Sequence, residues 1–195
     1  SSASVYGLNE NSQEISDNES PLNIYAESKL LFDKYIMSQE YPAVGLRYFN
    51  VYGRGEENKG KMASMAYKMN LEYLESKRIS LFKGTGGYGD GEQKRDFIYI
   101  DDVVEGYYEL EKRTTTDYKC YNLTTNIKVT VGDLTSAIKE LVGTNTTIIH
   151  DGSTPGDQFG VYGNNHKVLD ETSWKPKTNL IEGLTIMIKW SKNNL

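Results

Sequence analysis

The chain has 195 residues, 37% of them hydrophobic, and a formal net charge of −5. This length allows one sound core or two small ones, and the acidic balance argues against broad nucleic-acid binding, which needs a basic surface. No run of about eighteen apolar residues occurs, so the sequence predicts no membrane-spanning helix. The one cysteine, Cys120, excludes an internal disulfide framework and fits a reducing compartment. We therefore expect a cytoplasmic protein in which Cys120 is a small core residue.

The first long helix is predicted to open with Ser20 as N-cap and Pro21 as first helical residue, and to end near Gln39. Tyr25 and Lys29, four residues apart, share one face of this helix. A phenol, with a pKa of about 10, is a poor base at neutral pH, and a cation within about 4–6 Å offsets much of that deficit. The spacing therefore favours proton removal from an alcohol by Tyr25. The buried stripe of the helix is expected to contain Leu22, Leu30, Leu31, Tyr35 and Ile36.

A short strand over residues 44–49 is of the type buried in a parallel sheet. It leads to Asn50, at the end of the strand where open α/β sheets bind their ligands. A loop rich in glycine and charge follows over residues 51–61. We interpret the next apolar residues as the core-facing stripe of a helix rather than as a methionine-lined ligand surface. They are Met62, Met65, Ala66, Met69 and Tyr73.

Residues 84–89 satisfy the GxGxxG spacing of a dinucleotide-binding turn and follow a predicted strand at 79–82. Such a turn needs a helix directly after it, whose amides meet the pyrophosphate. Polar residues without a helical period follow instead, so we predict a hairpin loop. After a strand at 97–100, Asp101 or Asp102 is expected to cap a helix that runs to about residue 113. These adjacent carboxylates do not face one another, which argues against paired acid/base chemistry.

The last part of the chain is predicted to add strands at 121–123 and 147–149 and a final helix from residue 179. Thr130 and Asp133 resemble a capping box before a helix that stops at Gly143. His150 and His166 lack the spacing of a metal site, and we expect no bound metal.

Three motifs, in this order, resemble the extended short-chain dehydrogenase/reductase superfamily of nucleotide-sugar epimerases and dehydratases. They are SASVYG at 2–7, Tyr25-x3-Lys29, and LRYFNVYG at 46–53. Within that superfamily, NKGKMAS at 58–64 and KRDFIYIDDV at 94–103 are most similar to the ADP-glycero-manno-heptose 6-epimerases. The likeness is strong to about residue 110 and looser beyond it. It implies an α/β fold: the C-terminal part of a Rossmann-type doubly wound parallel sheet plus a smaller mixed α/β substrate-binding lobe.

The resemblance also implies a division of the chain. Residues 1–54 would complete an NAD(P)-binding Rossmann domain, and residues 55–195 would form mainly the substrate-binding lobe, with segments that can return to the sheet. In the family a dinucleotide-binding half precedes the position of Ser1, so we expect a C-terminal fragment of a longer enzyme. By itself this fragment is expected to be inactive and to bind no NADP tightly. The choice between NAD and NADP stays open, because the selecting residue lies in the other half.

The resemblance implies a catalytic role for Ser2, Tyr25, Lys29 and Lys59. Ser2 would donate to the substrate oxygen, Tyr25 would take the alcohol proton, and Lys29 would assist the phenol and bind ribose hydroxyls. Lys59 matches a second proton-transfer group, on the opposite side of the sugar carbon from Tyr25. Such a group is useful because inversion through a ketone removes and returns hydride on opposite faces of that carbon. The implied cofactor-binding residues are Tyr25, Lys29, Val51 and Lys59.

A second set of residues is implied to bind the substrate. Arg95 matches a family arginine that grips the nucleotide diphosphate, a task that suits its planar fork. Asn50 would orient the sugar or the diphosphate, and residues 82–85 match a stretch that lies against the nucleotide. Lys68 stands in place of a substrate-contacting histidine of the heptose epimerases. The full set is Asn50, Lys61, Lys68, Phe82, Lys83, Gly84, Thr85 and Arg95.

We therefore expect an NAD(P)-dependent epimerase of a nucleotide-diphosphate sugar, similar to the ADP-heptose 6-epimerases, that works by transient oxidation to a ketone and re-reduction. We expect a homo-oligomer without nucleic-acid or membrane partners. Residues 155–157 look more like the UDP-sugar epimerases, so a UDP-sugar 4-epimerase or a dehydratase remains an alternative. A noncatalytic nucleotide-sugar or NAD-binding protein is a further alternative, which Tyr25 and Lys29 disfavour because sensing needs no proton acceptor.

Overall fold

The computed structural model describes residues 1–9, 12–39, 41–113, 116–143, 145–152, 160 and 162–194. Its helices are η1 (Ala3–Tyr6), η2 (Ser16–Asn18), α1 (Ile24–Ser38), η3 (Gly60–Met62), α2 (Met65–Ser76), α3 (Ile100–Glu111), α4 (Val131–Val142), α5 (His166–Glu171) and α6 (Leu180–Asn194), where η denotes a 3-10 helix. Its strands are β1 (Ala43–Tyr48), β2 (Asn50–Tyr52), β3 (Arg78–Leu81), β4 (Lys94–Arg95), β5 (Phe97–Tyr99), β6 (Tyr118–Leu123), β7 (Val129–Thr130) and β8 (Thr147–His150). None of these helices is long and apolar enough to cross a membrane.

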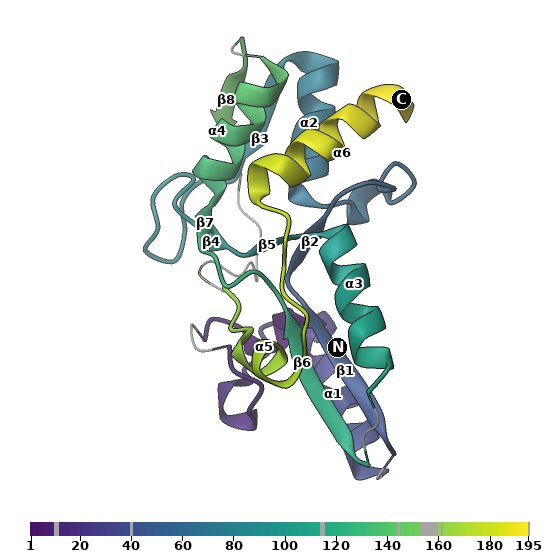
Figure 1. Ribbon diagram of the computed structural model, residues 1–195. Helices are drawn as coiled ribbons and strands as arrows, with labels where there is room; N and C mark the ends of the chain where they lie inside the picture. Colours follow the sequence, from purple (N-terminus) through teal and green to yellow (C-terminus); the bar gives the residue numbers. More distant parts are fainter. Residues whose placement is uncertain are drawn as a thin grey trace.

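Parallel strands connected through helices dominate the architecture. Within the described residues, β1 pairs with β6, β2 with β5 and β3 with β8, all in parallel, while β4 and β7 form an antiparallel pair. In Figure 1, β1 and β6 lie in the lower part of the molecule with α1 and α3, and β3 and β8 lie in the upper part with α2 and α4. This arrangement confirms the predicted α/β class.

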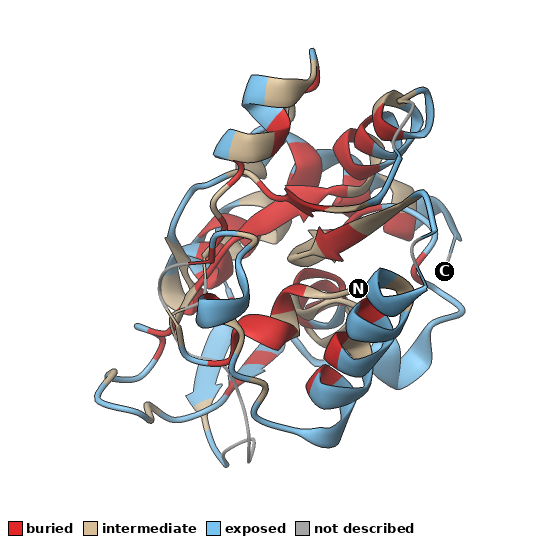
Figure 2. Cartoon of the chain, turned by 90° about the horizontal axis from the view of Figure 1, so that it is seen from below, coloured by how far each residue is buried: buried red, intermediate tan, exposed pale blue. Residues whose placement is uncertain are grey.

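The buried residues form two larger clusters and a small one. In the upper part, α2, α4 and α6 enclose β3 and β5, with Tyr67, Ile79, Leu134 and Leu184 among the fully buried side chains. In the lower part, β1, β6, α3 and α5 share a second cluster, and a third joins η1 to Leu30 of α1. Figure 2 shows the buried residues gathered in the interior and the exposed ones along the outer sides of the helices.

A buried ionic cluster, centred on Arg47 of β1, holds the lower part together. The Arg47 guanidinium pairs with Glu19 and, at 3.3 Å, with Asp33 of α1. It also lies 4.9 Å from the ring centroid of Tyr6 in η1, and Ser1 Oγ donates to Asp33 at 2.6 Å. Strand β1, helix α1 and the turn that follows Ser1 are therefore tied to one cation.

Replacing Arg47 by methionine should lower the free energy of unfolding by about 3–5 kcal/mol, because it leaves the buried Asp33 and the partly buried Glu19 without their cation. Urea denaturation measures this effect. The matched control is Arg54→Met, which removes an exposed pair with Asp101 at 2.8 Å and should change stability little. Equal losses for the two variants would contradict the importance of the buried cluster.

Helix α1 differs from its prediction at its start and on its buried face. The N-cap is Asn23, whose side chain accepts from the Ala26 amide at 2.9 Å. Ser20 instead donates its amide to the Val5 carbonyl at 2.8 Å and so belongs to an extended segment beside η1. Of the expected stripe only Leu30 is buried, and Ile36 is partly buried. Leu22, Leu31 and Tyr35 are exposed, because α1 packs on the rest of the described chain along the side that carries Ala26, Leu30 and Asp33.

Helix α3 shows a second correction. It begins at Ile100 after Tyr99, and neither aspartate caps it. The Asp102 carboxylate accepts from the backbone amides of Lys177 and Thr178 at 3.2 and 3.0 Å, while Asp101 pairs with Arg54. The two acids therefore hold other segments, and no acid/base pair forms.

Other local predictions have mixed outcomes. The capping box of Thr130 and Asp133 and the stop at Gly143 are confirmed. The strands at 44–49 and 79–82 are confirmed within a residue as β1 and β3, but residues 84–89 connect β3 to β4 in different strand pairs, so they form a loop and not a hairpin. The core interpretation of Met69 and Tyr73 is confirmed, whereas Met62 is exposed in η3. Residues 155–157, which look more like the UDP-sugar epimerases, lie outside the described residues.

Candidate functional site

Ser2 lies at the start of η1 as its N-cap. Its Oγ accepts from the Ser4 amide at 3.2 Å and from Ser4 Oγ at 2.9 Å. The capping interaction fixes the direction of the Ser2 side chain, which is only partly buried. The hydroxyl is thus held in place by the turn, and its donation to a substrate oxygen remains a prediction.

Tyr25 and Lys29 share one face of α1, as the spacing predicts. The Lys29 Nζ lies 5.3 Å from the centroid of the Tyr25 ring, within the range of a cation–π contact. The Tyr25 side chain is 54% exposed, and Lys29 is partly buried. The pair therefore offers a phenol with an adjacent ammonium on an accessible helix face.

Asn50 and Val51 begin β2. The Asn50 side-chain amide donates to the Asp96 carbonyl at 3.0 Å, and its backbone amide donates to the same oxygen at 3.1 Å. Val51 pairs with Ile98 across the parallel strands. Both residues are partly buried, so the strand pair fixes them where β1 and β2 join.

Lys59, Lys61 and Lys68 come from the loop after β2, from η3 and from α2. Lys59 is 48% exposed, and its Nζ lies 3.8 Å from the carboxylate of Glu56. The Lys68 Nζ donates to the Lys61 carbonyl at 2.6 Å, which ties α2 to η3. Lys61 and Lys68 thus lie side by side, while Lys59 is paired within its own loop.

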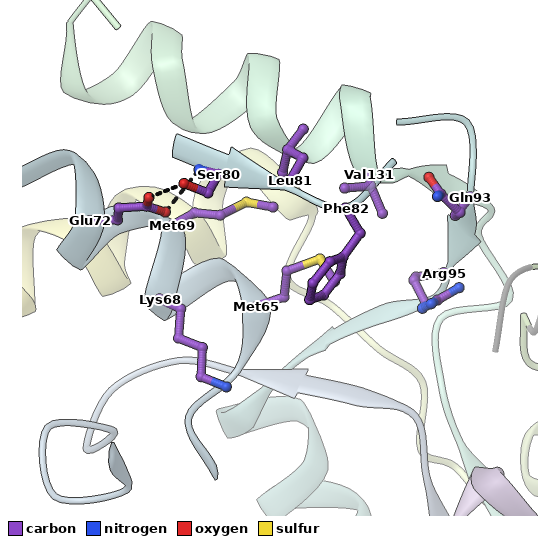
Figure 3. A pocket seen from close by; sticks show the side chains of 10 residues that line it. All are labelled: Met65, Lys68, Met69, Glu72, Ser80, Leu81, Phe82, Gln93, Arg95 and Val131. Carbon is purple, nitrogen blue, oxygen red and sulfur yellow. Dashed lines mark hydrogen bonds between the residues drawn. The ribbon is translucent and has the colours of Figure 1, made fainter. Parts of the chain in front are cut away.

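One cavity, of about 320 Å³, brings three of the predicted substrate-binding residues together. Lys68, Phe82 and Arg95 line it, with Met65 and Met69 of α2, Leu81 of β3 and Val131 of α4 as apolar wall. Figure 3 shows Met65 and Phe82 between the ends of Lys68 and Arg95 in this view. A mainly apolar cavity of this size, with the cations of Lys68 and Arg95 and the carboxylate of Glu72 at its wall, has the dimensions of a small-molecule site.

Three further residues of the cavity wall, all polar, are absent from the sequence prediction: Glu72, Ser80 and Gln93. Glu72 accepts from the Ser80 amide at 2.9 Å and from its hydroxyl, which anchors α2 to β3 along the cavity wall. Gln93 donates to the Lys83 carbonyl at 3.1 Å. No motif marks these residues, because they meet only when β3, β4 and α2 pack. Met65 and Met69 show that one stripe can serve the core and a cavity wall together.

Lys83, Gly84 and Thr85 are not among the residues that line this cavity. Glycine is needed at position 84 for a steric reason, since a Cβ there would lie 2.3 Å from the Tyr88 carbonyl oxygen. Its amide donates to the Asp90 carboxylate at 2.7 Å. Ser2, Tyr25, Lys29 and Lys59 also lie outside this cavity: Ser2 caps η1, Tyr25 and Lys29 lie on α1, and Lys59 lies in the loop after β2.

Two other groups with reactive side chains are inert by environment. Burial raises the pKa of the Cys120 thiol to about 11, and the side chain is buried, so it stays a neutral core residue as predicted. Burial also raises the pKa of Tyr6, whose hydroxyl donates to Asn122 at 2.8 Å. Among the buried tyrosines of this region, Tyr6 is thus a structural hydrogen-bond donor, in contrast to the exposed Tyr25.

The donors on α1 suit part of a dinucleotide. The Lys29 ammonium, which lies against the Tyr25 ring, and the Tyr25 hydroxyl can both donate to ribose hydroxyls. The described glycine-rich loop at 84–89 opens no helix, so it lacks the amide cradle that a pyrophosphate needs. The residues present therefore fit the ribose end of such a cofactor.

Parallel strands and connecting helices define an α/β protein, and one mainly apolar cavity carries Lys68 and Arg95 at its wall. Residues 1–123 match the NAD dependent epimerase/dehydratase family, and the chain belongs to this family.

Named relatives give finer similarities. The chain is 47% identical over 108 residues to the ADP-L-glycero-D-manno-heptose-6-epimerase of Alkalilimnicola ehrlichii, a match that spans 53% of this chain and 34% of that protein. The crystal structure of the Helicobacter pylori ADP-L-glycero-D-manno-heptose-6-epimerase superimposes with a TM-score of 0.81 at 31% identity, over 97% of this chain and 57% of that one. A Bacillus cereus UDP-glucuronic acid 4-epimerase variant, in complex with a UDP-sugar and NAD, does so with a TM-score of 0.79 at 25% identity, over 100% and 60%. The chain thus spans about a third to three fifths of the length of these proteins.

Proposed function

We propose that this chain is the substrate-binding and proton-transferring part of an epimerase of nucleotide-diphosphate sugars, of the ADP-heptose 6-epimerase type. The observation that carries the proposal is the cavity that unites Phe82, Arg95 and Lys68. An aromatic ring stacks on a nucleobase, and guanidinium and ammonium groups bind phosphates, so the cavity matches the two ends of a nucleoside diphosphate. The named relatives support this substrate class.

The proton chemistry is assigned to α1 and the loop after β2. Tyr25 takes the proton of the sugar hydroxyl, Ser2 donates a hydrogen bond to the same oxygen, and Lys29 supplies the positive charge that a phenolate needs beside it. Lys59 serves the opposite side of the sugar carbon. A bound nicotinamide would supply the redox chemistry, by accepting and returning the hydrogen of that carbon. Cytoplasmic location and a homo-oligomeric assembly stay predictions.

The proposal is tested by assaying the complete protein that contains this chain against ADP-heptose and a panel of UDP-sugars. The expected result is inversion at C6 of the heptose, which NMR detects. Conversion of UDP-sugars at C4 without activity on ADP-heptose would favour the 4-epimerase alternative. Binding without any conversion would favour a noncatalytic protein.

Phe82→Ala should raise KM for the nucleotide sugar by about 5- to 150-fold, because base–aromatic stacking contributes about 1–3 kcal/mol. Turnover at saturating substrate should change little, since Phe82 lies at the cavity and not on α1. Steady-state kinetics of the complete protein give both values. Tyr108→Ala, which removes an exposed aromatic ring from α3, is the control and should leave KM unchanged. An unchanged KM in Phe82→Ala would remove the nucleotide from this cavity.

A further inference from the structure

A buried carboxylate stands at the base of the loop that carries Lys59. Glu56 is only 2% exposed, although a charged group is costly to bury unless other groups pair with it. Neither the cavity lining nor the predicted site contains this residue. Its contacts therefore need an explanation.

The Glu56 carboxylate closes the loop between β2 and α2. It accepts from the Gly53 amide at 3.1 Å, from the Ser64 amide at 2.5 Å and from the Ser64 hydroxyl at 2.8 Å. Gly53 directly follows β2, and Ser64 is the N-cap of α2, whose Oγ also accepts from the Tyr67 amide at 3.1 Å. Both ends of the loop are thus fastened to one side chain.

Lys59 lies inside this closed loop and contacts the same residue twice. Its backbone amide donates to the Glu56 carbonyl at 3.0 Å, and its Nζ lies 3.8 Å from Glu56 Oε2. The Lys59 carbonyl in turn accepts from the Met62 amide at 2.9 Å, at the start of η3. The amine, which is half exposed, is therefore held next to a fixed negative charge.

We infer that Glu56 is a positioning residue for Lys59. Its carboxylate fixes the loop and pairs with the Lys59 ammonium, and so it holds the Lys59 side chain in place for proton transfer to the substrate. The inference rests on the proposed function, in which Lys59 serves the second side of the sugar carbon. Other ionisable groups near Glu56 are Glu57, next in the chain and exposed, and the buried Tyr67 of α2, while Lys61 and Lys68 contact each other. In the part of the chain that the structure describes, Lys59 forms its ion pair with Glu56.

The test compares Glu56→Gln with Glu57→Gln in the complete protein. Both variants remove one negative charge, but only the first removes the partner of Lys59, while glutamine preserves the size of the side chain. Acetic anhydride reacts with a free amine and not with an ammonium, so the acetylation rate of Lys59, measured by mass spectrometry of its peptide, reports the pairing without any turnover. Glu56→Gln should raise this rate about two- to five-fold at a given pH, the range for a half-exposed pair. It should also shift the alkaline limb of the pH–rate profile of epimerisation to lower pH, and Glu57→Gln should do neither.

Equal acetylation rates in the wild type and Glu56→Gln overturn the inference, whether or not the enzyme turns over. Shifted acetylation with an unmoved pH–rate profile also overturns it, because the pair would then be structural. Glu56→Asp, which keeps the charge, distinguishes a loss of folding from a loss of pairing and should retain the wild-type profile at a reduced rate. Absence of any epimerisation by the wild type overturns the proposed function itself, a result separate from the acetylation measurement.

Discussion

Tyr25→Phe should lower the turnover of the nucleotide sugar by about 100- to 10,000-fold, the usual contribution of a positioned general acid or base. Phenylalanine keeps the ring beside Lys29 and loses only the hydroxyl, so cofactor binding should remain. Steady-state assays of the complete protein give the turnover, and titration with the nicotinamide cofactor gives the affinity. The expected pattern is lost catalysis with a bound cofactor.

Tyr35→Phe is the matched control for this variant. Tyr35 lies on the same helix, ten residues further on, and is exposed to a similar degree. Its hydroxyl has no role in the proposed chemistry, so turnover should stay at the wild-type level. Near-normal turnover in Tyr25→Phe would remove the role assigned to Tyr25, because no proton acceptor would then be needed at that position.

Lys59→Met should separate the two epimerase types. Epimerisation at C6 of ADP-heptose should fall by about 100-fold or more, because a second proton-transfer group is lost. Conversion of a UDP-sugar at C4 would be spared, since Lys59 is incidental to that reaction. Parallel assays on both substrates measure the difference.

Lys34→Met is the control, because it removes one exposed lysine from α1 and leaves the loop after β2 intact. It should leave both activities unchanged. Wild-type heptose epimerisation by Lys59→Met would discard the two-group scheme and with it the role proposed for Glu56. The assignment of Tyr25 would be unaffected by that outcome.

The features that the sequence predicts well are those set by local geometry. Tyr25 and Lys29 meet because the helical period places residues four apart on one face. The capping box of Thr130 and Asp133 also needs only neighbouring residues. The start of α1 shows the limit of local rules, since Ser20 and Asn23 both suit an N-cap. The bond from the Ser20 amide to the Val5 carbonyl, which no pattern marks, decides in favour of Asn23.

The features that the sequence does not reveal depend on contacts between distant segments. Arg47 is buried against Asp33 and Glu19, and Glu72 meets Ser80, only after the strands and helices have packed. Glu56 reads as one charge in a polar loop, and its burial follows from the way Gly53 and Ser64 fold around it. The resemblance to the epimerases leads to Arg95 and Phe82, but the cavity that joins them is a product of the fold.

In the proposed complex, the Tyr25 hydroxyl faces the sugar hydroxyl that loses its proton while the nucleotide occupies the cavity at Phe82 and Arg95. A crystal structure of the complete protein with a bound nucleotide sugar measures this directly. We predict about 2.6–3.2 Å between the Tyr25 oxygen and the reacting hydroxyl, the reach required of a general base. A nucleotide bound elsewhere, or a sugar beyond the reach of Tyr25 even through one water, would contradict the account.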